Sequence, residues 1–406
     1  MITTAAVVFW GSVLLVAHSY VLYPLLLKLF SIGKKGNSNV YAVDDVSLPQ
    51  VYVVFAAYNE EKVIAEKLES IFRTSYPMEK LKVYVGSDNS TDRTNEIIEQ
   101  FAAQHPQLHF FSFEGRNGKA TVLNKLVSEI ESTGIDKDNT VYVFTDANVM
   151  FTTDTLYELA KHFKNETIGQ IGANILNRGQ QRDGISHQET AYIQRENHIK
   201  YLEGLNWGSM MGAFGACHAM RANMWTVIPS NYLMEDFYLS MHVLSQNKKA
   251  IKELKAVCYE DVSNEVQEEF KRKTRIQAGN FQNLSSYWKL LFRFNAVSFC
   301  FLSHKVLRWL GPLFIVLAYV SNLLLWVSGA QFPVVPNIYK ITFLLQNILL
   351  LTPLIDRFLQ SNNVHLKLLR FVAYFYWMNL ALVKGLGMYV KGVKTSAWSP
   401  TKRNIN

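Results

Sequence analysis

The chain has 406 residues, of which 49% are apolar and only 18% are charged, and its formal net charge is +8 at pH 7. This length allows one sizeable domain together with membrane segments, and a soluble protein usually carries more charge. The composition therefore argues against a purely soluble protein. The sequence has no aromatic and basic signature of the kind that binds RNA, so no nucleic-acid partner is expected.

Residues 1–36 predict a membrane anchor with a basic flank. Lys28 is the only formally charged residue between Ile2 and Phe30. The stretch is long enough to cross a hydrocarbon layer of about 30 Å at about 1.5 Å per residue. No basic stretch precedes it and no convincing cleavage site follows it, which favours an anchor over a signal peptide. Residues 37–50 then form a polar linker.

Residues 51–283 predict a cytosolic α/β domain. Its first part alternates strands and helices, expected at 51–57, 60–73, 82–85, 92–104, 109–113, 119–131 and 141–145. This alternation indicates parallel strands joined by right-handed crossovers, as in the nucleotide-binding half of a doubly wound sheet. The stretch 151–279 is less regular and is expected to carry the acceptor side.

Polar side chains follow three of the predicted strands. Tyr58 and Glu60 come after the first, Asp88 after the second, and Asp146 closes the continuous apolar run 141–145. Because ligands of open α/β sheets bind at the carboxyl ends of the strands, these side chains are expected at one binding edge.

The C-terminal third predicts membrane association. An interfacial helix is expected over 284–304, membrane segments over 305–390 with spans at 305–327 and 339–355, and a basic tail over 391–406. Basic residues at both flanks of the middle domain place that domain in the cytosol at the inner or plasma membrane. Whether 371–390 spans is left open, because Asn379 and Lys384 favour a re-entrant or interfacial segment.

Six short motifs occur in the order and spacing of the membrane-bound family 2 glycosyltransferases. They are Ala56-Ala57-Tyr58-Asn59-Glu60-Glu61, Asp88-Asn89-Ser90-Thr91-Asp92, Gly118-Lys119-Ala120 with Leu123-Asn124, Asp146-Ala147-Asn148, Glu235-Asp236 and Arg272-x-x-Arg275. The chain resembles the branch of the cellulose, hyaluronan and poly-N-acetylglucosamine synthases. The resemblance implies a GT-A fold, a UDP-sugar donor and inversion assisted by Mg²⁺ or Mn²⁺.

The resemblance assigns a nucleotide-binding role to residues of both halves of the domain. Tyr58 would lie on the uracil face and Asp88 would accept the uracil imide hydrogen. Arg272 and Arg275, one helical turn apart, could meet the same pyrophosphate. The full set of expected nucleotide-binding residues is Ala56, Tyr58, Glu60, Asp88, Lys119, Asp146, Arg272 and Arg275.

The expected metal ligands are Asp146 and Asn148. A hard divalent ion prefers carboxylate oxygen and would neutralise the departing UDP. The family pattern is Asp-x-Asp, so Asn148 in the second position puts metal affinity in doubt more than metal use.

Asp236 is the expected general base, and Glu235 is expected to orient the acceptor or raise the pKa of Asp236. The synthases usually carry Gln-x-x-Arg-Trp where this chain has Arg272 and ends on Ile276, so a stacking platform for the acceptor sugar is not expected.

These features predict an inverting, metal-dependent glycosyltransferase that uses a UDP-sugar and a glycan or lipid-linked acceptor. Polysaccharide synthesis is favoured, with partner subunits of an export complex as a further expectation. The alternatives are transfer of a single sugar to a lipid carrier and, from another class, a membrane-anchored nucleotide-sugar sensor without turnover, which would have no need for Asp236.

Overall fold

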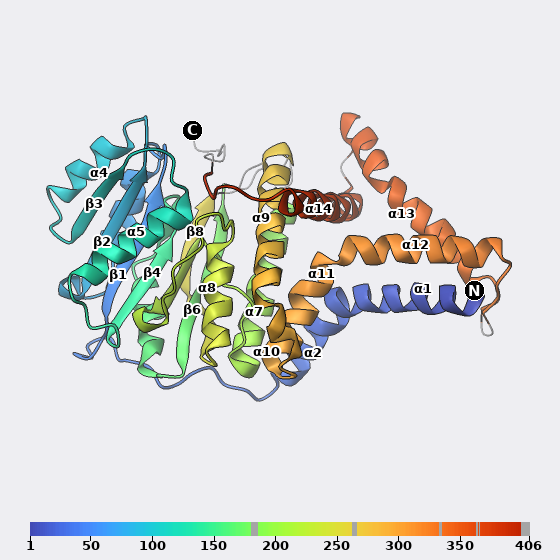
Figure 1. The fold of residues 1–406 in the computed structure, drawn as a ribbon, viewed down its shortest axis with the longest axis horizontal. Coiled ribbons are helices and arrows are strands. Elements are labelled where there is room, and N and C mark those ends of the chain that lie inside the picture. Colours follow the sequence, from blue (N-terminus) through green and yellow to red (C-terminus); the bar gives the residue numbers. More distant parts are fainter. Residues whose placement is uncertain (180–185, 262–265, 333–334, 363, 365, 399–406) are drawn as a thin grey trace.

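The computed structural model describes residues 1–179, 186–261, 266–332, 335–362, 364 and 366–398, which form an α/β domain joined to long apolar helices (Figure 1). The sheet has the strand order β3-β2-β1-β4-β7-β6-β8-β5. The strands are β1 (Gln50–Ala57), β2 (Leu81–Asp88), β3 (Leu108–Phe113), β4 (Thr140–Thr145), β5 (Val149–Phe151), β6 (Ile168–Arg178), β7 (Cys217–Arg221) and β8 (Lys249–Asp261).

The first half of the sheet is parallel. Val53 of β1 lies opposite Val83 of β2 on one side and Val143 of β4 on the other, and β3 runs parallel to β2. In the second half, β7 is antiparallel to β4 and β6, whereas β6 and β8 are parallel. The predicted mostly parallel α/β sheet with helices is thereby confirmed.

Helices cover both faces of the sheet because the central strands are apolar on both. Val53 and Phe55 pack on one face with α3 (Ile64–Phe72), α4 (Thr94–Ala102) and α6 (Thr155–Ala160). Tyr52 and Val54 pack on the other face. The helices on that side are α5 (Lys119–Ser132) and α8 (Glu235–Ser245).

The remaining helices lie within the α/β domain or form the apolar region beside it. They are α1 (Ile2–Ala17), η1 (His18–Leu22), α2 (Tyr23–Phe30), α7 (Ser186–Trp207), α9 (Val266–Tyr287), η5 (Trp288–Phe292), α10 (Ala296–Cys300), η6 (Phe301–Val306), α11 (Leu307–Trp309), α12 (Gly311–Val327), α13 (Ile338–Ser361) and α14 (Lys367–Val390), with short 3₁₀ turns η2 (Met78–Lys80), η3 (Lys161–Lys164) and η4 (Ala222–Met224).

Two described segments, Ile2–Phe30 and Ile338–Ser361, are long and apolar enough to cross a membrane. A third span results if Ala296–Trp309 and Gly311–Val327, which meet at 63°, are one broken segment. In Figure 1, α1 and α12 lie side by side and project away from the sheet, and Phe9 and Leu325 belong to their buried contact. The helix α14, which includes 371–390, is not among these candidates.

The single interfacial helix expected over 284–304 is not what the structure contains. The helix α9 ends at Tyr287, a 3₁₀ turn follows, and α10 starts anew after Asn295. Phe294 has a positive φ of 49°, which interrupts a helix, and Asn295 forms a capping box with Ser298. Local capping chemistry therefore divides this stretch despite its apolar and aromatic composition.

Candidate active site

A pocket of about 400 Å³ opens at the carboxyl ends of β1 and β4. Ala56, Glu60, Asp146 and Asn148 line its sheet side, and side chains from η1, α7, η6, α11 and α14 line the side toward the candidate spans. Asp236 lines the same pocket. The two carboxylates singled out by the sequence therefore share one cavity, whose size suits a small-molecule substrate.

Lys119, the first residue of α5, joins two acidic groups at this edge. Its Nζ lies 2.5 Å from Asp146 Oδ1 and 2.5 Å from Glu235 Oε1. Burial by itself would lower the pKa of Lys119, but these two carboxylates outweigh burial and raise it. A firmly protonated amine beside Asp146 is a suitable counter-charge for a phosphate.

Asp236 lies in the first turn of α8 and is buried. Its Oδ1 accepts a hydrogen bond from the Phe237 N–H at 2.7 Å. Burial, followed by the neighbouring Glu235, raises the pKa of Asp236 to about 6. A Cβ on Gly215 would lie 3.1 Å from Asp236 Oδ2, so glycine at this position gives the carboxylate room. A carboxylate of this pKa is well matched to proton transfer near neutral pH.

Asp88 is fully buried and holds the loop that precedes α5. Its carboxylate accepts hydrogen bonds from the backbone N–H of Asn117 at 2.7 Å and of Gly118 at 3.0 Å, and from Arg116 Nε at 3.3 Å. The Arg116 guanidinium in turn lies 3.2 Å from the centre of the Tyr58 ring. The structure thus gathers Tyr58 and Asp88 around one loop. Asp88 is not among the residues that line the pocket, and its contact with uracil stays a prediction.

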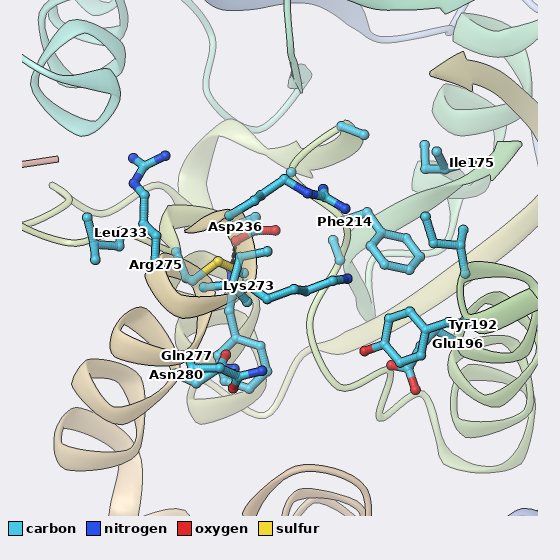
Figure 2. Close-up of a pocket in the computed structure, with 18 of the residues that line it drawn as sticks. Ile175, Tyr192, Glu196, Phe214, Leu233, Asp236, Lys273, Arg275, Gln277 and Asn280 are labelled. Carbon is cyan, nitrogen blue, oxygen red and sulfur yellow. Dashed lines mark hydrogen bonds between the residues drawn. The ribbon is translucent and has the colours of Figure 1, made fainter. Parts of the chain in front are cut away.

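The two arginines of α9 line the pocket but have different partners. Arg272 forms ion pairs of 2.9 Å with both Glu189 and Glu269. Arg275 donates to the Ser396 carbonyl at 2.8 Å, and its buried Nε has no partner among the described residues. Figure 2 shows Arg275 and Asp236 among the side chains that line this pocket. Arg275 can therefore serve an anionic ligand more readily, and joint binding of one pyrophosphate by both arginines stays a prediction.

The predicted metal ligands fit a divalent ion that is shared with a diphosphate. The Asp146 side chain is 34% exposed, and Asn148 lines the same pocket. Within the described ranges, no group of three His, Cys, Asp or Glu side chains is placed to hold a metal by itself. Mg²⁺ is commonly held by one or two carboxylates together with substrate phosphates, and Asp146 and Asn148 could supply oxygen atoms in that manner.

Residues 391–398, here called the C-terminal strap, return from α14 to the α/β domain (Figure 1). Ser396 Oγ donates to the Ser230 carbonyl at 2.8 Å, and Asn231 Nδ2 donates to the Val393 carbonyl at 3.1 Å. The Trp398 ring lines the pocket, 6.3 Å from the Tyr58 ring. Sequence alone indicates no site role for this segment, because a Trp in a basic tail carries no local signal of a cavity.

The helix α7 contributes a row of charged side chains that the sequence analysis also missed. Glu189, Glu196, Lys200 and Glu203 lie on one face of the helix because they are spaced by three, four or seven residues, and the first three of them line the pocket. Such a row in a sequence resembles a solvated helix face. Only the packing of the C-terminal helices over α7 buries it.

Comparisons with known proteins agree with this geometry. The family model described as Glycosyl transferase family 2 matches residues 52–225. A beta-monoglucosyldiacylglycerol synthase of Synechocystis sp. is 30% identical over 162 residues, which cover 37% of this chain and 32% of that protein. The probable glycosyltransferase YdaM of Bacillus subtilis is 34% identical over 99 residues, 23% of this chain and 24% of its own length. The matches thus span about a third or less of these curated relatives.

A solved structure of the mannosyltransferase PcManGT from Pyrobaculum calidifontis, in complex with GDP-Man and Mn²⁺, matches 94% of this chain and 99% of its own, with a TM-score of 0.68 and 19% sequence identity. At 19% identity, this similarity shows a shared fold. Together with the family match, it leads to one conclusion: residues 52–225 form a family 2 glycosyltransferase domain, and the fold is GT-A-like.

Proposed function

We propose that the chain transfers a sugar from a nucleoside diphosphate sugar, expected to be a UDP-sugar, to a hydroxyl group of a membrane lipid. The observation that supports this most is the shared pocket. Asp146, Lys119 and Asp236 line one cavity whose far wall comes from helices next to the candidate spans. A donor can therefore approach from the sheet edge and an acceptor from the membrane side.

The comparisons support the same substrate classes. One relative is named for the synthesis of a glucosylated diacylglycerol, and the solved neighbour contains a sugar nucleotide and Mn²⁺. The first name fits an acceptor that is a membrane lipid, and the location we propose for the catalytic domain is the cytosolic face of a membrane.

In the proposed reaction, the oxygen of the acceptor hydroxyl attacks the anomeric carbon from the side opposite the diphosphate. The bond between that carbon and the diphosphate oxygen breaks, the nucleoside diphosphate leaves, and the hydroxyl proton passes to the Asp236 carboxylate. Lys119 and Arg275 offer positive charge to the departing diphosphate, and Glu235 holds Lys119 in place. A divalent ion at Asp146 and Asn148 would add charge neutralisation when bound.

Polysaccharide synthesis is the second candidate. It is favoured by the position of the pocket, which is walled partly by α11 and α14, so that a growing chain could leave between the C-terminal helices. Sizing of the product distinguishes the two candidates, because single transfer yields one glycolipid and synthesis of a polymer yields a ladder of lengths.

The decisive experiment measures nucleoside diphosphate release by the full chain in detergent, with Mn²⁺ or Mg²⁺, from several UDP-sugars and from GDP-mannose. Asp236→Asn should lower release at least about hundredfold, the usual contribution of a general base, while UDP binding persists. Asp154→Asn, at the exposed start of α6, is the matched control and should leave release unchanged. Unchanged turnover in Asp236→Asn would remove the base assignment, and no release by the wild type from any donor would favour the sensor.

A further inference from the structure

We propose that the membrane side of the pocket binds a phosphate group carried by the lipid acceptor, with Lys200 of α7 as its principal counter-charge. The inference rests on the proposed function and deepens it, because it specifies an anionic acceptor, whereas a diacylglycerol is neutral. The ionic partners of the α7 side chains carry it.

The two glutamates that flank Lys200 on α7 are already satisfied. Glu196 pairs with Lys305 at 3.1 Å and with Arg308 at 2.5 Å. Glu203 accepts hydrogen bonds from the Tyr23 hydroxyl at 2.6 Å and the Met211 N–H at 2.9 Å, and it contacts His304 Nδ1 at 2.7 Å. Lys200 is one helical turn from Glu196 and from Glu203, but the hydrogen bonds and ion pairs of both carboxylates go to other residues.

Lys200 is thereby left as a buried amine without an ion pair, although Glu196, Asp236 and Glu203 attract it at longer range. Its residue is only 4% exposed, and no hydrogen bond or ion pair to another described residue is formed. Its Nζ lies 3.5 Å from the centre of the Phe214 ring, and both residues line the pocket. The contact with the ring face offsets only part of the cost of removing an ammonium group from water.

The protonation of Lys200 reflects the same imbalance. Burial, followed by repulsion from Lys305, lowers the pKa of Lys200 to about 7. A phosphate in the cavity would stabilise the charged form and supply the missing counter-ion. The side chain is therefore arranged for a ligand with negative charge.

Two further donors in the pocket lack partners. The buried Nε–H groups of Arg308 and Arg275 donate to no acceptor in the described part of the chain, and both residues line the cavity. A phosphate has several acceptor oxygens and could satisfy more than one such donor. Arg275 lies closer to the expected diphosphate, so Arg308 is the natural second contact of the acceptor.

The lipid nature of the ligand follows from the remaining wall. Trp309 of α11 and Met378 and Leu382 of α14 are apolar and line the same side of the pocket. A soluble phosphate would gain nothing from contact with this apolar surface, whereas acyl or prenyl chains would be removed from water there. The acceptor would thus lie with its chains toward these helices, its phosphate at Lys200 and its hydroxyl at Asp236.

The test measures binding in the absence of donor, so it is independent of turnover. Full-length protein in a neutral detergent is titrated calorimetrically with short-chain phosphatidylglycerol, short-chain diacylglycerol and glycerol 3-phosphate. Phosphatidylglycerol carries a phosphate and a free hydroxyl, the diacylglycerol lacks the phosphate, and glycerol 3-phosphate lacks the chains. Wild-type protein should bind phosphatidylglycerol most tightly of the three.

Lys200→Met should weaken binding of phosphatidylglycerol about tenfold or more, the loss expected for one charged hydrogen bond. Lys255→Met removes an exposed lysine outside the pocket and should change nothing. Lys200→Met should not lower Tm, because it removes an unpaired buried charge, whereas loss of a purely structural lysine would lower it.

Equal binding of phosphatidylglycerol by Lys200→Met and wild type would overturn the proposal. If that variant does not fold, the wild type decides alone, and equal affinity for diacylglycerol overturns the phosphate site. Equal affinity for glycerol 3-phosphate overturns the lipid part. Release of nucleoside diphosphate without phosphate-dependent binding would reject this inference and leave the proposed function standing.

Discussion

Asp236 is a buried carboxylate next to a second acidic residue, and this pairing sets the pH at which it can accept a proton. With a pKa raised to about 6, Asp236 is protonated below that pH and cannot act as a base. We therefore expect kcat/KM for transfer to fall as the pH decreases through about 6.

The acid limb of that profile should move in Glu235→Gln. The Glu235 charge raises the pKa of Asp236 and Lys119 lowers it. Removal of the Glu235 charge leaves Lys119 with only Asp146 as an ion-pair partner, so both effects shift the limb to lower pH. Glu129→Gln, on the exposed side of α5, is the control. A pH profile of Glu235→Gln that coincides with that of the wild type would contradict this electrostatic account.

Asn148 contributes an amide where an acidic residue is common in the resembled family. Asn148→Asp adds a full charge, so Mn²⁺ binding in the presence of UDP should tighten by about tenfold, since ligand charge tunes metal affinity. Asp146→Asn should weaken it. Calorimetric titration of Mn²⁺ with and without UDP measures both, and unchanged affinity in Asn148→Asp would exclude this position from the metal site.

At the scale of elements, the contact between the C-terminal strap and the loop before α5 depends on a glycine. Gly118 has a φ of +85°, and a Cβ there would lie 2.5 Å from Ser396 Oγ and 2.8 Å from the Ala397 N. Gly115 also has a positive φ, of +69°, but a Cβ there meets nothing within 4 Å. The two glycines therefore separate backbone strain from displacement of the strap.

Gly118→Ala should release the strap, whereas Gly115→Ala should cost only backbone strain of about 1 kcal/mol. Limited trypsin digestion measures this, because Lys391 and Lys394 lie in the strap. Cleavage there should be faster in Gly118→Ala than in Gly115→Ala. Equal cleavage rates in the two variants would mean that the position of the strap does not depend on its contact with Gly118.

At the scale of the whole molecule, one buried carboxylate connects three distant parts of the chain. Glu203 of α7 is bound by Tyr23 of α2 and contacts His304 of η6. The N-terminal helix, the catalytic domain and the C-terminal helices therefore meet at a single charged group. Loss of one of its donors would leave this buried carboxylate with an unsatisfied hydrogen-bond acceptor, which is costly.

Tyr23→Phe should accordingly destabilise the protein by about 1–3 kcal/mol and lower Tm in detergent. Tyr201→Phe, on α7 beside Glu203, removes a hydroxyl that has no hydrogen bond to other described residues and serves as the control. Equal Tm values for the two variants would show that the Tyr23 hydroxyl does not hold the anchor to the domain.

The sequence by itself determined the strands and crossovers of residues 51–145, and it indicated Asp146, Lys119 and Asp236 as candidate site residues, which the structure brings to one pocket. Strand periodicity and the strand-end rule are local properties, so they can be read without coordinates. The break of the helix expected over 284–304 was also encoded locally, by the Asn295 cap, but its apolar and aromatic composition concealed it.

Only the tertiary structure decided which charges find partners. Glu189 pairs with Arg272, Glu196 is neutralised from η6 and α11, and Ser396 reaches Arg275 from a distant part of the chain. These contacts join residues separated by 83, 112 and 121 positions. No local pattern specifies such pairing, because it depends on how the C-terminal helices pack over α7 and α9.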